Sequence, residues 1–139
     1  MIVQDEITLS GTADTDAVDV TVRVADIVTR SGVREGLCVV FVPGSTAAVT
    51  TIEFEPGVVE DLKRAVEQLA PRDIPYAHDA AWGDGNGYAH VRAALLGPSF
   101  AVPVVEGRLT LGTWQQIVVL DFDNRPRRRR IMVQITGER

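Results

Sequence analysis

The sequence has few of the features that mark secreted, disulfide-stabilised or membrane proteins. Its 139 residues include one cysteine, Cys38, which excludes an internal disulfide. This cysteine lies in the apolar run LCVVFV (37–42), so we expect it as a small buried side chain. The N-terminus lacks a basic segment followed by an apolar core, and no apolar run reaches the roughly 20 residues of a membrane span. These absences predict a cytoplasmic protein with no membrane partner.

Positive charge is also scarce overall, despite one conspicuous run. The formal net charge is −5, which gives no general attraction to nucleic acid or to anionic membranes. Four consecutive arginines occupy 127–130, but no aromatic residues are interleaved with them. We therefore expect no nucleic-acid partner. With 45% hydrophobic and 24% charged residues the composition is that of a globular protein, and 139 residues fit a single domain spanning 1–139.

Hydrophobic residues at helical spacing predict two or three helices. The first is expected from Thr21 and to end at Gly32. Pro56 is expected to open the second, because its missing N–H costs nothing in a first turn. A shorter third helix is predicted over 88–96. The buried stripe of the second helix is expected to contain Val58, Val59, Leu62, Ala65, Val66 and Leu69.

Apolar and alternating segments predict the strands, and residues 11–16 are expected to form a loop. We expect the strand over 46–52 to pair with the one over 37–42, and residues 109–122 to form one long strand. Hairpins beside helices indicate an α+β fold, a single domain with a largely antiparallel, sandwich-like sheet. The predicted strands cover 2–10, 37–42, 46–52, 100–105, 109–122 and 128–136.

Both histidines of the chain flank a glycine-rich turn. His78 and His90 bracket Gly-Asp-Gly-Asn-Gly (83–87), which contains three of the twelve glycines. Oxygens of Asp84 and Asn86 and nitrogens of the two imidazoles can together hold a cation. Zinc usually takes three protein ligands in a catalytic site, so a carboxylate or a water would complete the set. Asp79 can ligate or orient an imidazole. The alternative is that the acid and amide close the turn on its own backbone and the histidines are ordinary residues.

A second candidate site lies at a strand break, in Pro-Gly-Ser-Thr (43–46). A glycine beside the hydroxyls of Ser45 and Thr46 can present donors to an anion, although the same residues also make an ordinary turn. Glu53 and Glu55 follow on one face and can coordinate Mg²⁺ or act as a base. A solvated strand edge is the alternative for this acidic pair.

The arginine run predicts that its side chains alternate between the two faces of a strand. Arg127 and Arg129 share one face, and Arg128 and Arg130 share the other. One pair can clamp a phosphate by bidentate bonds, and the other can lie in solvent or in a subunit contact. Alternatively the charges simply protect the strand from edge pairing. Earlier in the chain, Leu-Gly-Thr-Trp-Gln-Gln (111–116) suggests a bulge, with Trp114 expected in the core or lining a pocket or interface with its amide neighbours.

These segments, in this order, resemble one protein family. FVPGSTAAVTTIE (41–53), YAHD (76–79), the turn and histidine of 83–90, LLGPSFAVPVVEGRLTLGTWQQI (95–117) and PRRRR (126–130) are similar to the YjbQ-like family. That family is also called UPF0047 or the secondary thiamine-phosphate synthase family. The resemblance covers about residues 20 to 137. It implies a compact α+β homotrimer with a site near the subunit boundaries and a weak thiamine-phosphate synthase activity whose physiological role is unsettled.

The resemblance also implies roles for individual residues, with one departure. Many members have Pro-His-Thr-Thr where this chain has Gly44 after Pro43, so a three-histidine site would become a two-histidine site here. The implied reaction joins a hydroxymethylpyrimidine pyrophosphate to a thiazole phosphate. The alternatives are a metal-dependent hydrolase of a small phosphorylated metabolite and a non-catalytic trimeric protein that binds a small anion. The expected divalent metal (Zn or Mg) and catalytic set is His78, His90 and Asp84, and the expected phosphate-binding set is Ser45, Thr46, Asn86, Arg127 and Arg129.

Overall fold

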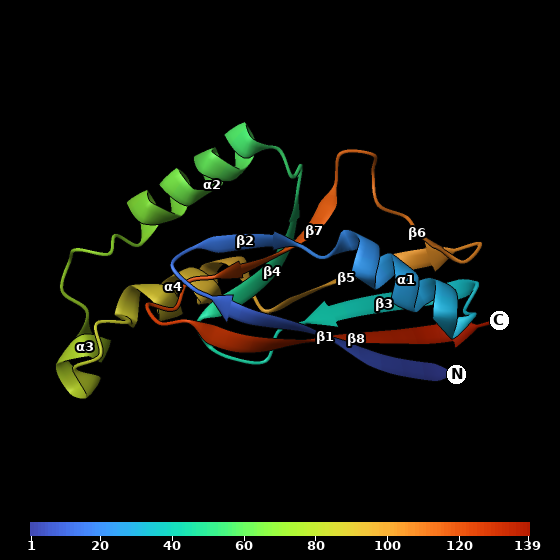
Figure 1. Cartoon of the computed structure of the whole chain (residues 1–139), viewed down its shortest axis with the longest axis horizontal. Helices are drawn as coiled ribbons and strands as arrows, with labels where there is room; N and C mark the ends of the chain where they lie inside the picture. The colour runs from blue at the N-terminus through green and yellow to red at the C-terminus, as the bar shows by residue number, and fades with distance from the viewer.

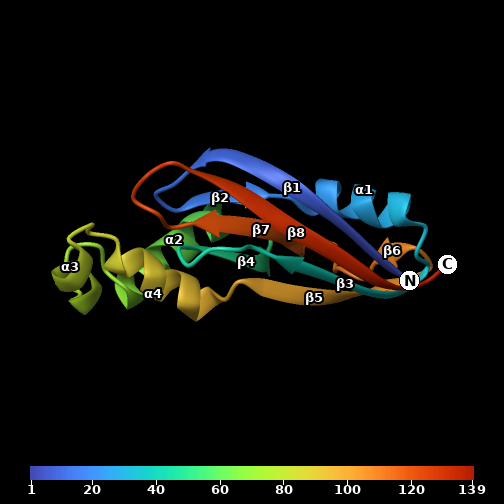
Figure 2. The same cartoon turned by 90° about the horizontal axis from the view of Figure 1, so that it is seen from below.

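Two antiparallel sheets packed face to face form the body of the protein (Figures 1 and 2). The computed structural model describes residues 1–139. The larger sheet has the order β1-β8-β3-β5-β6 and the smaller one has the order β2-β7-β4. This arrangement confirms the predicted α+β class. The strands are β1 (Ile2–Thr12), β2 (Asp16–Asp19), β3 (Glu35–Phe41), β4 (Ala47–Ile52), β5 (Ser99–Val105), β6 (Arg108–Leu109), β7 (Gln116–Asp121) and β8 (Arg127–Glu138).

Four helices accompany the sheets, and they gather at two ends of the molecule. Helix α1 (Thr21–Ser31) lies near the chain termini, whereas α2 (Pro56–Leu69), α3 (Ala77–Trp82) and α4 (Gly87–Leu96) lie at the opposite end (Figure 1). The predicted end of α1 is confirmed, since Gly32 adopts the left-handed conformation with φ 73°. None of the four helices combines the length and apolarity needed to cross a lipid bilayer.

A cluster of apolar side chains, which we call the valine core, fills the space between the larger sheet, α1 and the smaller sheet. It comprises 19 buried residues, among them Val24 of α1, Val40 of β3 and Ile131 of β8. Each fully buried side chain of this size contributes about 1.5–3 kcal/mol of transfer free energy. Cys38 is fully buried here, as expected, and burial raises the pKa of its thiol to about 11. The valine core therefore has no ionised group.

Two predicted strand arrangements are wrong, for one physical reason. The strand over 46–52 exists as β4, but it pairs with β7 in the smaller sheet and not with β3. The segment 109–122 is not one strand, because β6 belongs to the larger sheet and β7 to the smaller one. Residues 110–115 cross between the sheets. Apolar periodicity identifies a strand but carries no information on which sheet receives it.

Helix α2 buries far less than its sequence pattern predicts. Of the expected stripe only Val66 is buried, and Leu69 is 70% exposed. Figure 1 shows α2 standing away from the sheets. Its C-terminal end is held mainly by Arg92 of α4, whose Nε donates to the carbonyl of Ala70 at 3.0 Å and whose Nη2 pairs with Glu67. The helix is thus anchored at one end by a buried guanidinium.

The structure differs from the sequence-based expectations at three further segments. The predicted loop over 11–16 overlaps the end of β1 and the start of β2, which was not predicted. The short helix α3 was also not predicted, because six residues give too little periodicity to detect. The core position expected for Trp114 is wrong, since this side chain is 73% exposed. It belongs to the loop that crosses between the sheets and so has no core beneath it.

Candidate functional site

The glycine-rich turn joins α3 to α4, and each of its glycines has a physical reason. Gly83 and Gly85 both have φ 66°, a left-handed conformation that side chains disfavour. Gly87 has no room for a side chain, because a Cβ there would lie 2.5 Å from the Cβ of Tyr76. The chain can therefore turn back tightly enough to bring the start of α4 against the start of α3.

This turn places the two histidines in contact. The ring centroids of His78 and His90 are 4.3 Å apart, and the ring planes are tilted by 39°. Nδ1 of His78 lies 3.3 Å from Oδ1 of Asp84 and 3.6 Å from Oδ1 of Asp79. That nitrogen is buried and makes no hydrogen bond. A buried polar atom without a partner beside two carboxylates is an arrangement that a divalent cation can satisfy.

The potential metal ligands differ somewhat from the set expected from the sequence. Ligand atoms of His78, Asp79 and Asp84 lie within 4.8 Å of one another, whereas the nitrogens of His90 are outside this cluster. Both carboxylates also hold the turn, since Asp79 accepts from the N–H of Gly87 at 2.9 Å and Asp84 accepts from the N–H of Asn86 at 3.2 Å. The turn-closing role considered as the alternative is therefore present together with the cluster.

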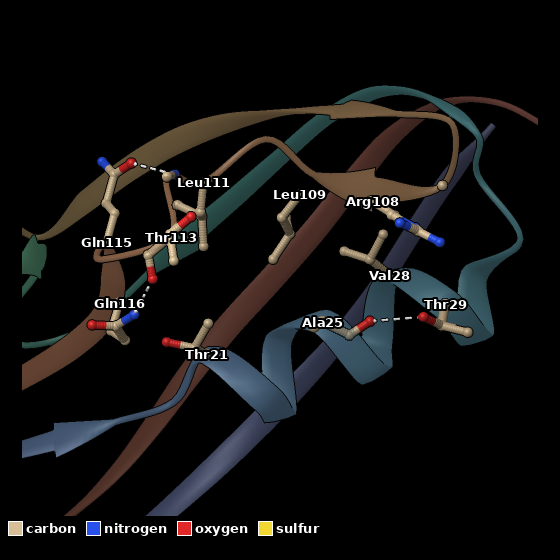
Figure 3. A pocket seen from close by; sticks show the side chains of 12 residues that line it. Thr21, Ala25, Val28, Thr29, Arg108, Leu109, Leu111, Thr113, Gln115 and Gln116 are labelled. Carbon is tan, nitrogen blue, oxygen red and sulfur yellow. Dashed lines mark hydrogen bonds between the residues drawn. The ribbon is translucent and has the colours of Figure 1, made fainter. Parts of the chain in front are cut away.

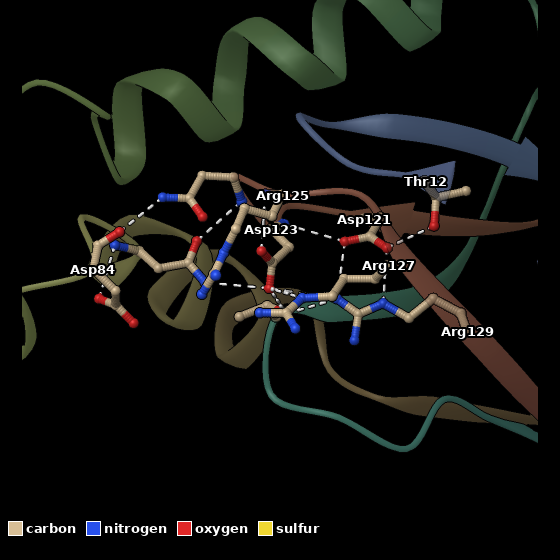
Figure 4. Close-up of polar contacts among 10 residues, drawn as sticks. Thr12, Asp84, Asp121, Asp123, Arg125, Arg127 and Arg129 are labelled. Carbon is tan, nitrogen blue, oxygen red and sulfur yellow. Dashed lines mark hydrogen bonds and ion pairs between the residues drawn. The ribbon is translucent and has the colours of Figure 1, made fainter. Parts of the chain in front are cut away.

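Asn86 ties the glycine-rich turn to the segment that joins β7 to β8. Figure 4 shows Asp84 of the turn near Asp123 of that segment. Its side chain is buried, and its amide donates to Oδ2 of Asp123 at 3.2 Å. Its carbonyl oxygen accepts from the N–H of Asn124 at 3.1 Å, and the Asn124 side chain donates to the carbonyl of Asp84 at 2.9 Å. Both ends of the Asn86 amide thus make a hydrogen bond within the chain. The phosphate contact expected of Asn86 stays a prediction.

Beyond Asn86 lies a group of polar side chains that we call the buried charge network. Arg129 makes a bidentate pair with Asp121, through Nε at 2.7 Å and Nη2 at 2.9 Å. Asp121 and Asp123 are each 1% exposed, so these charges are removed from water. Such pairs need complete hydrogen bonding to be tolerated. The members of the network are Thr12, Thr46, Asn86, Asp121, Asp123, Arg127 and Arg129.

Asp123 is the junction of this network. Burial by itself raises the pKa of its carboxyl. Hydrogen bonds from the backbone N–H of Arg125 and from the side chains of Thr46, Arg127 and Asn86 outweigh burial, so the pKa lies below its ordinary value. Asp123 is therefore an anion that bonds simultaneously to the glycine-rich turn, to the 43–46 loop and to β8.

The structure confirms that the arginines alternate between two faces, and part of the inner pair is already bonded within the chain. Arg129 is buried, Arg127 pairs with Asp123 through Nε at 3.0 Å, and Arg128 and Arg130 are exposed on the outer face. Of the three guanidinium nitrogens of Arg129, only Nη1 makes no hydrogen bond. It lies beside Gly44, where a Cβ would be 2.9 Å away. Any side chain at position 44 would displace it.

Some of the remaining predicted residues are hydrogen-bonded within the chain, and others are exposed to solvent. Thr46 is buried and donates to Asp123 at 2.9 Å, whereas Ser45 is exposed. Glu55 caps α2, because its carboxylate accepts from the N–H groups of Gly57 and Val58 at 2.8 Å each. These bonds lower its pKa. Glu55 is committed to the helix, so an acidic pair with Glu53 for Mg²⁺ or base chemistry is not formed.

Sequence reasoning did not single out Asp121 and Asp123. A signal was present, because the two acids are spaced two apart, as are Arg127 and Arg129, on either side of a short turn. Alternate residues of a strand share a face. Strands β7 and β8 belong to the two different sheets, and the acidic and the basic pair meet between these sheets. Opposite charges at matched spacing across a turn therefore predict a pair.

A groove lies away from the histidines, between α1 and the loop that follows β6 (Figure 3). Its volume is about 330 Å³, and it combines the apolar side chains of Val28, Leu109 and Leu111 with the amides of Gln115 and Gln116. These amides are bonded to Gly112 at 3.0 Å and to Thr113 at 3.2 Å, and also to Thr51 and Phe54 beside the loop. The expectation that the paired amides line a pocket is thus met, but without Trp114.

Comparison with known proteins decides the family. The model of the family described as "UPF0047 protein YjbQ-like" matches residues 5–138. The chain belongs to this UPF0047 family. It is 41% identical to a UPF0047 protein of Archaeoglobus fulgidus over 93% of this chain and 98% of the relative. It is 43% identical to one of Mycobacterium tuberculosis over 83% of this chain and 92% of the relative.

Solved structures of UPF0047 relatives agree with this membership. A YbjQ-like protein of unknown function from Sulfolobus solfataricus superposes with a TM-score of 0.94 at 36% identity, covering 99% of both chains. A YjbQ/UPF0047 protein from Clostridium acetobutylicum gives a TM-score of 0.86 at 35% identity, covering 95% of this chain and 99% of the other. The two-sheet architecture described above is therefore that of the family.

Proposed function

We propose that this UPF0047 chain is a transferase for small phosphorylated metabolites, with the thiamine-phosphate synthase reaction as the specific candidate. The observation that carries the proposal is the contact between His78 and His90 beside the unpartnered Nδ1 of His78 and the carboxylates of Asp79 and Asp84. Such a concentration of nitrogen and oxygen ligands at one turn fits a cation-assisted site.

In the proposed reaction a ring nitrogen of a thiazole phosphate forms a bond to the methylene carbon of the pyrimidine. The bond from that carbon to the pyrophosphate oxygen breaks, and the electron pair leaves with pyrophosphate. Catalysis then consists of alignment and charge neutralisation. A divalent cation held by His78, Asp79 and Asp84 would supply neutralising charge at the leaving group. Ser45 and the free nitrogens of Arg127 and Arg129 would donate to phosphate oxygens.

The test is direct assay of the purified protein with both precursors and added Zn²⁺ or Mg²⁺. We expect thiamine phosphate to form and His90→Ala to lower the rate at least ten-fold. Arg128→Ala is the matched control, because this arginine lies on the exposed outer face and should leave the rate unchanged. Equal rates for wild type and His90→Ala would rule out the assignment. Release of phosphate or pyrophosphate without the thiazole substrate would indicate the hydrolase instead.

One observation favours the non-catalytic alternative. Arg127 and Arg129 are each paired with a buried aspartate, so the inner face of β8 has no excess positive charge. A site of this kind would bind a small anion only weakly and would not strongly stabilise a pyrophosphate leaving group. Thermal stabilisation by phosphate, with no turnover at any metal concentration, would support this binding function over the transferase.

We also propose that the protein self-associates as the homotrimer that the family resemblance implies. The outer face of the larger sheet supports this, because Leu37, Phe41 and Val105 are each at least 40% exposed there. Exposed apolar patches on a sheet face are typical of interfaces. Sedimentation analysis should give a trimer for the wild type and a smaller species for Phe41→Arg. A wild-type monomer would contradict the proposal.

A further inference from the structure

The two histidines of the candidate site come from separate helices with little to hold them in register. Helix α3, which carries His78, has six residues and none of them is buried. Burial of α3 itself therefore contributes little to fixing it relative to α4, which carries His90, although Tyr76 just before α3 packs against Gly87 of α4. The polar contacts of the turn between the helices supply the further constraints on the relative position of the two rings.

We infer that Asn86 and Asp123 act as a positioning pair that sets the placement of His78, Asp84 and His90. The inference rests on the proposed function only in taking these three residues as the site. Neither Asn86 nor Asp123 would touch the substrate or a metal. They would act by holding the turn against the segment that joins β7 to β8.

The chemistry of Asn86 matches this role closely. The amide donates to the anionic carboxylate of Asp123 at 3.2 Å and accepts from the N–H of Asn124 at 3.1 Å. Only a side chain with one donor end and one acceptor end satisfies both neighbours. A carboxylate at position 86 would keep the second bond but would oppose Asp123 with a like charge in a buried location.

The position of Asn86 in the chain transmits this contact to the site. It is the residue immediately before α4, and its carbonyl accepts from the N–H of His90 at 3.4 Å. Its own N–H donates to the carboxylate of Asp84 at 3.2 Å. A displacement of Asn86 therefore moves Asp84 and the first turn of α4 together.

Asp123 connects the same pair to the opposite side of the site. Its carboxylate accepts from Thr46 at 2.9 Å and from Arg127 at 3.0 Å. The pair consequently lies between the histidine cluster and the residues proposed for phosphate. The pair fixes the distance between these two groups by buried hydrogen bonds. Such bonds are stronger and more directional than contacts in water.

The test uses the wild type and three variants, Asn86→Asp, Asp123→Asn and the double variant that combines them. Nuclear Overhauser contacts between the imidazole protons of the two histidines report ring placement without substrate, at pH 8. Isothermal titration with Zn²⁺ alone reports the ligand set. We expect Asn86→Asp to lose the ring contacts and to weaken Zn²⁺ binding at least ten-fold. Asp123→Asn should retain both, because its amide oxygen can still accept from Asn86.

The double variant provides the rescue that distinguishes positioning from general destabilisation. The carboxylate introduced at position 86 would accept from the new amide at position 123, so ring contacts and Zn²⁺ affinity should return to within three-fold of the wild type. Thr12→Val is the matched control, because it removes a buried 2.7 Å bond to Asp121 on the far side of the same network. It should lower stability but leave the ring contacts intact.

Each result separates this inference from the proposed function. Ring contacts that persist in folded Asn86→Asp, or that stay absent in the folded double variant, would overturn the positioning role. If Asn86→Asp does not fold, Asn86→Ala at the same pH replaces it, with loss of the ring contacts expected and their retention contradicting the inference. Zn²⁺ binding too weak to measure leaves the ring contacts as the deciding readout. If no thiamine phosphate forms but the ring contacts respond as expected, the transferase proposal is wrong and the positioning role stands.

Discussion

The valine core and the buried charge network adjoin each other within the same sheets, yet they are stabilised in different ways. In the valine core 19 side chains are removed from water without a single ion pair. In the network, Asp121 and Asp123 are equally buried, and each is satisfied by an arginine and a threonine. The first region is stabilised by the area it buries, and the second survives because every charge has a partner.

The buried charge network carries a desolvation penalty that the valine core does not. Desolvation of a buried ion pair roughly cancels its attraction, so apolar residues in the same volume would serve stability at least as well. The network nevertheless connects β1, the 43–46 loop, the segment from β7 to β8 and the glycine-rich turn. Specific geometry near the histidines is the property that an apolar replacement would not supply.

The largest loss of stability is expected when a buried charge of the network loses its main partner. Asp121→Asn would strand Arg129, whose side chain is 8% exposed, and we expect a loss of about 3–5 kcal/mol in the free energy of unfolding. Urea denaturation at pH 7 measures the loss. Combining the change with Arg129→Met should recover most of it, because the buried charge that then remains, Asp123, keeps its partner Arg127. A loss below about 1 kcal/mol would show that water reaches the pair.

Acid should affect the network before it affects the valine core. The pKa of Asp123 is lower in the folded protein than in the unfolded chain, so its contribution is present above the unfolded value of about 3.9 and is lost as pH falls through the folded value. Asp123→Asn should flatten the pH dependence of unfolding below about pH 4 by at most about 1.4 kcal/mol per pH unit. Denaturation series from pH 2 to 7 would reveal an unchanged slope if Asp123 does not contribute.

A conservative deletion in the valine core should be smaller and insensitive to pH. Ile135 is fully buried on β8, and Ile135→Val removes one methylene group at a cost of about 1 kcal/mol. The loss should be the same at pH 5 and pH 8, because the titratable group opposite it on β3, the thiol of Cys38, has its pKa raised to about 11 and is neutral at both pH values. A loss that varies with pH would mean that the two regions are energetically coupled.

The smallest effect is expected from the arginine next to the network. Arg128 is exposed and forms no ion pair, although it precedes the buried Arg129 directly. Arg128→Ala should change the free energy of unfolding by no more than about 0.5 kcal/mol. A loss comparable to that of Asp121→Asn would contradict the alternation of faces along β8. The same measurement in the assembled protein would reveal a subunit contact at this face.

Local features of the sequence predicted most of the elements and half of the site. Helix α1 and its end at Gly32 follow from apolar spacing and a left-handed glycine, both of which act within a few residues. The contact between His78 and His90 was expected because a short turn separates them. The roles assigned to these two residues in metal binding and catalysis stay predictions.

Interactions between distant segments account for what the sequence did not reveal. Strand β4 pairs with β7, more than sixty residues later in the chain, and local periodicity cannot specify such a partner. Leu69 has the spacing of a buried residue on α2, yet the helix stands clear of the sheets. Asp123 is important because the glycine-rich turn, the 43–46 loop and β8 meet at its carboxylate, which only the folded chain brings together.

The order of the larger sheet has a consequence for synthesis of the protein. Strand β8 follows the other seven strands in the chain, yet it lies between β1, the first of them, and β3. Until β8 has been synthesised, β1 has no strand to pair with, and one edge of β3 stays open. Closure of this sheet therefore waits for β8, and the nascent chain carries unpaired apolar strands until that strand emerges.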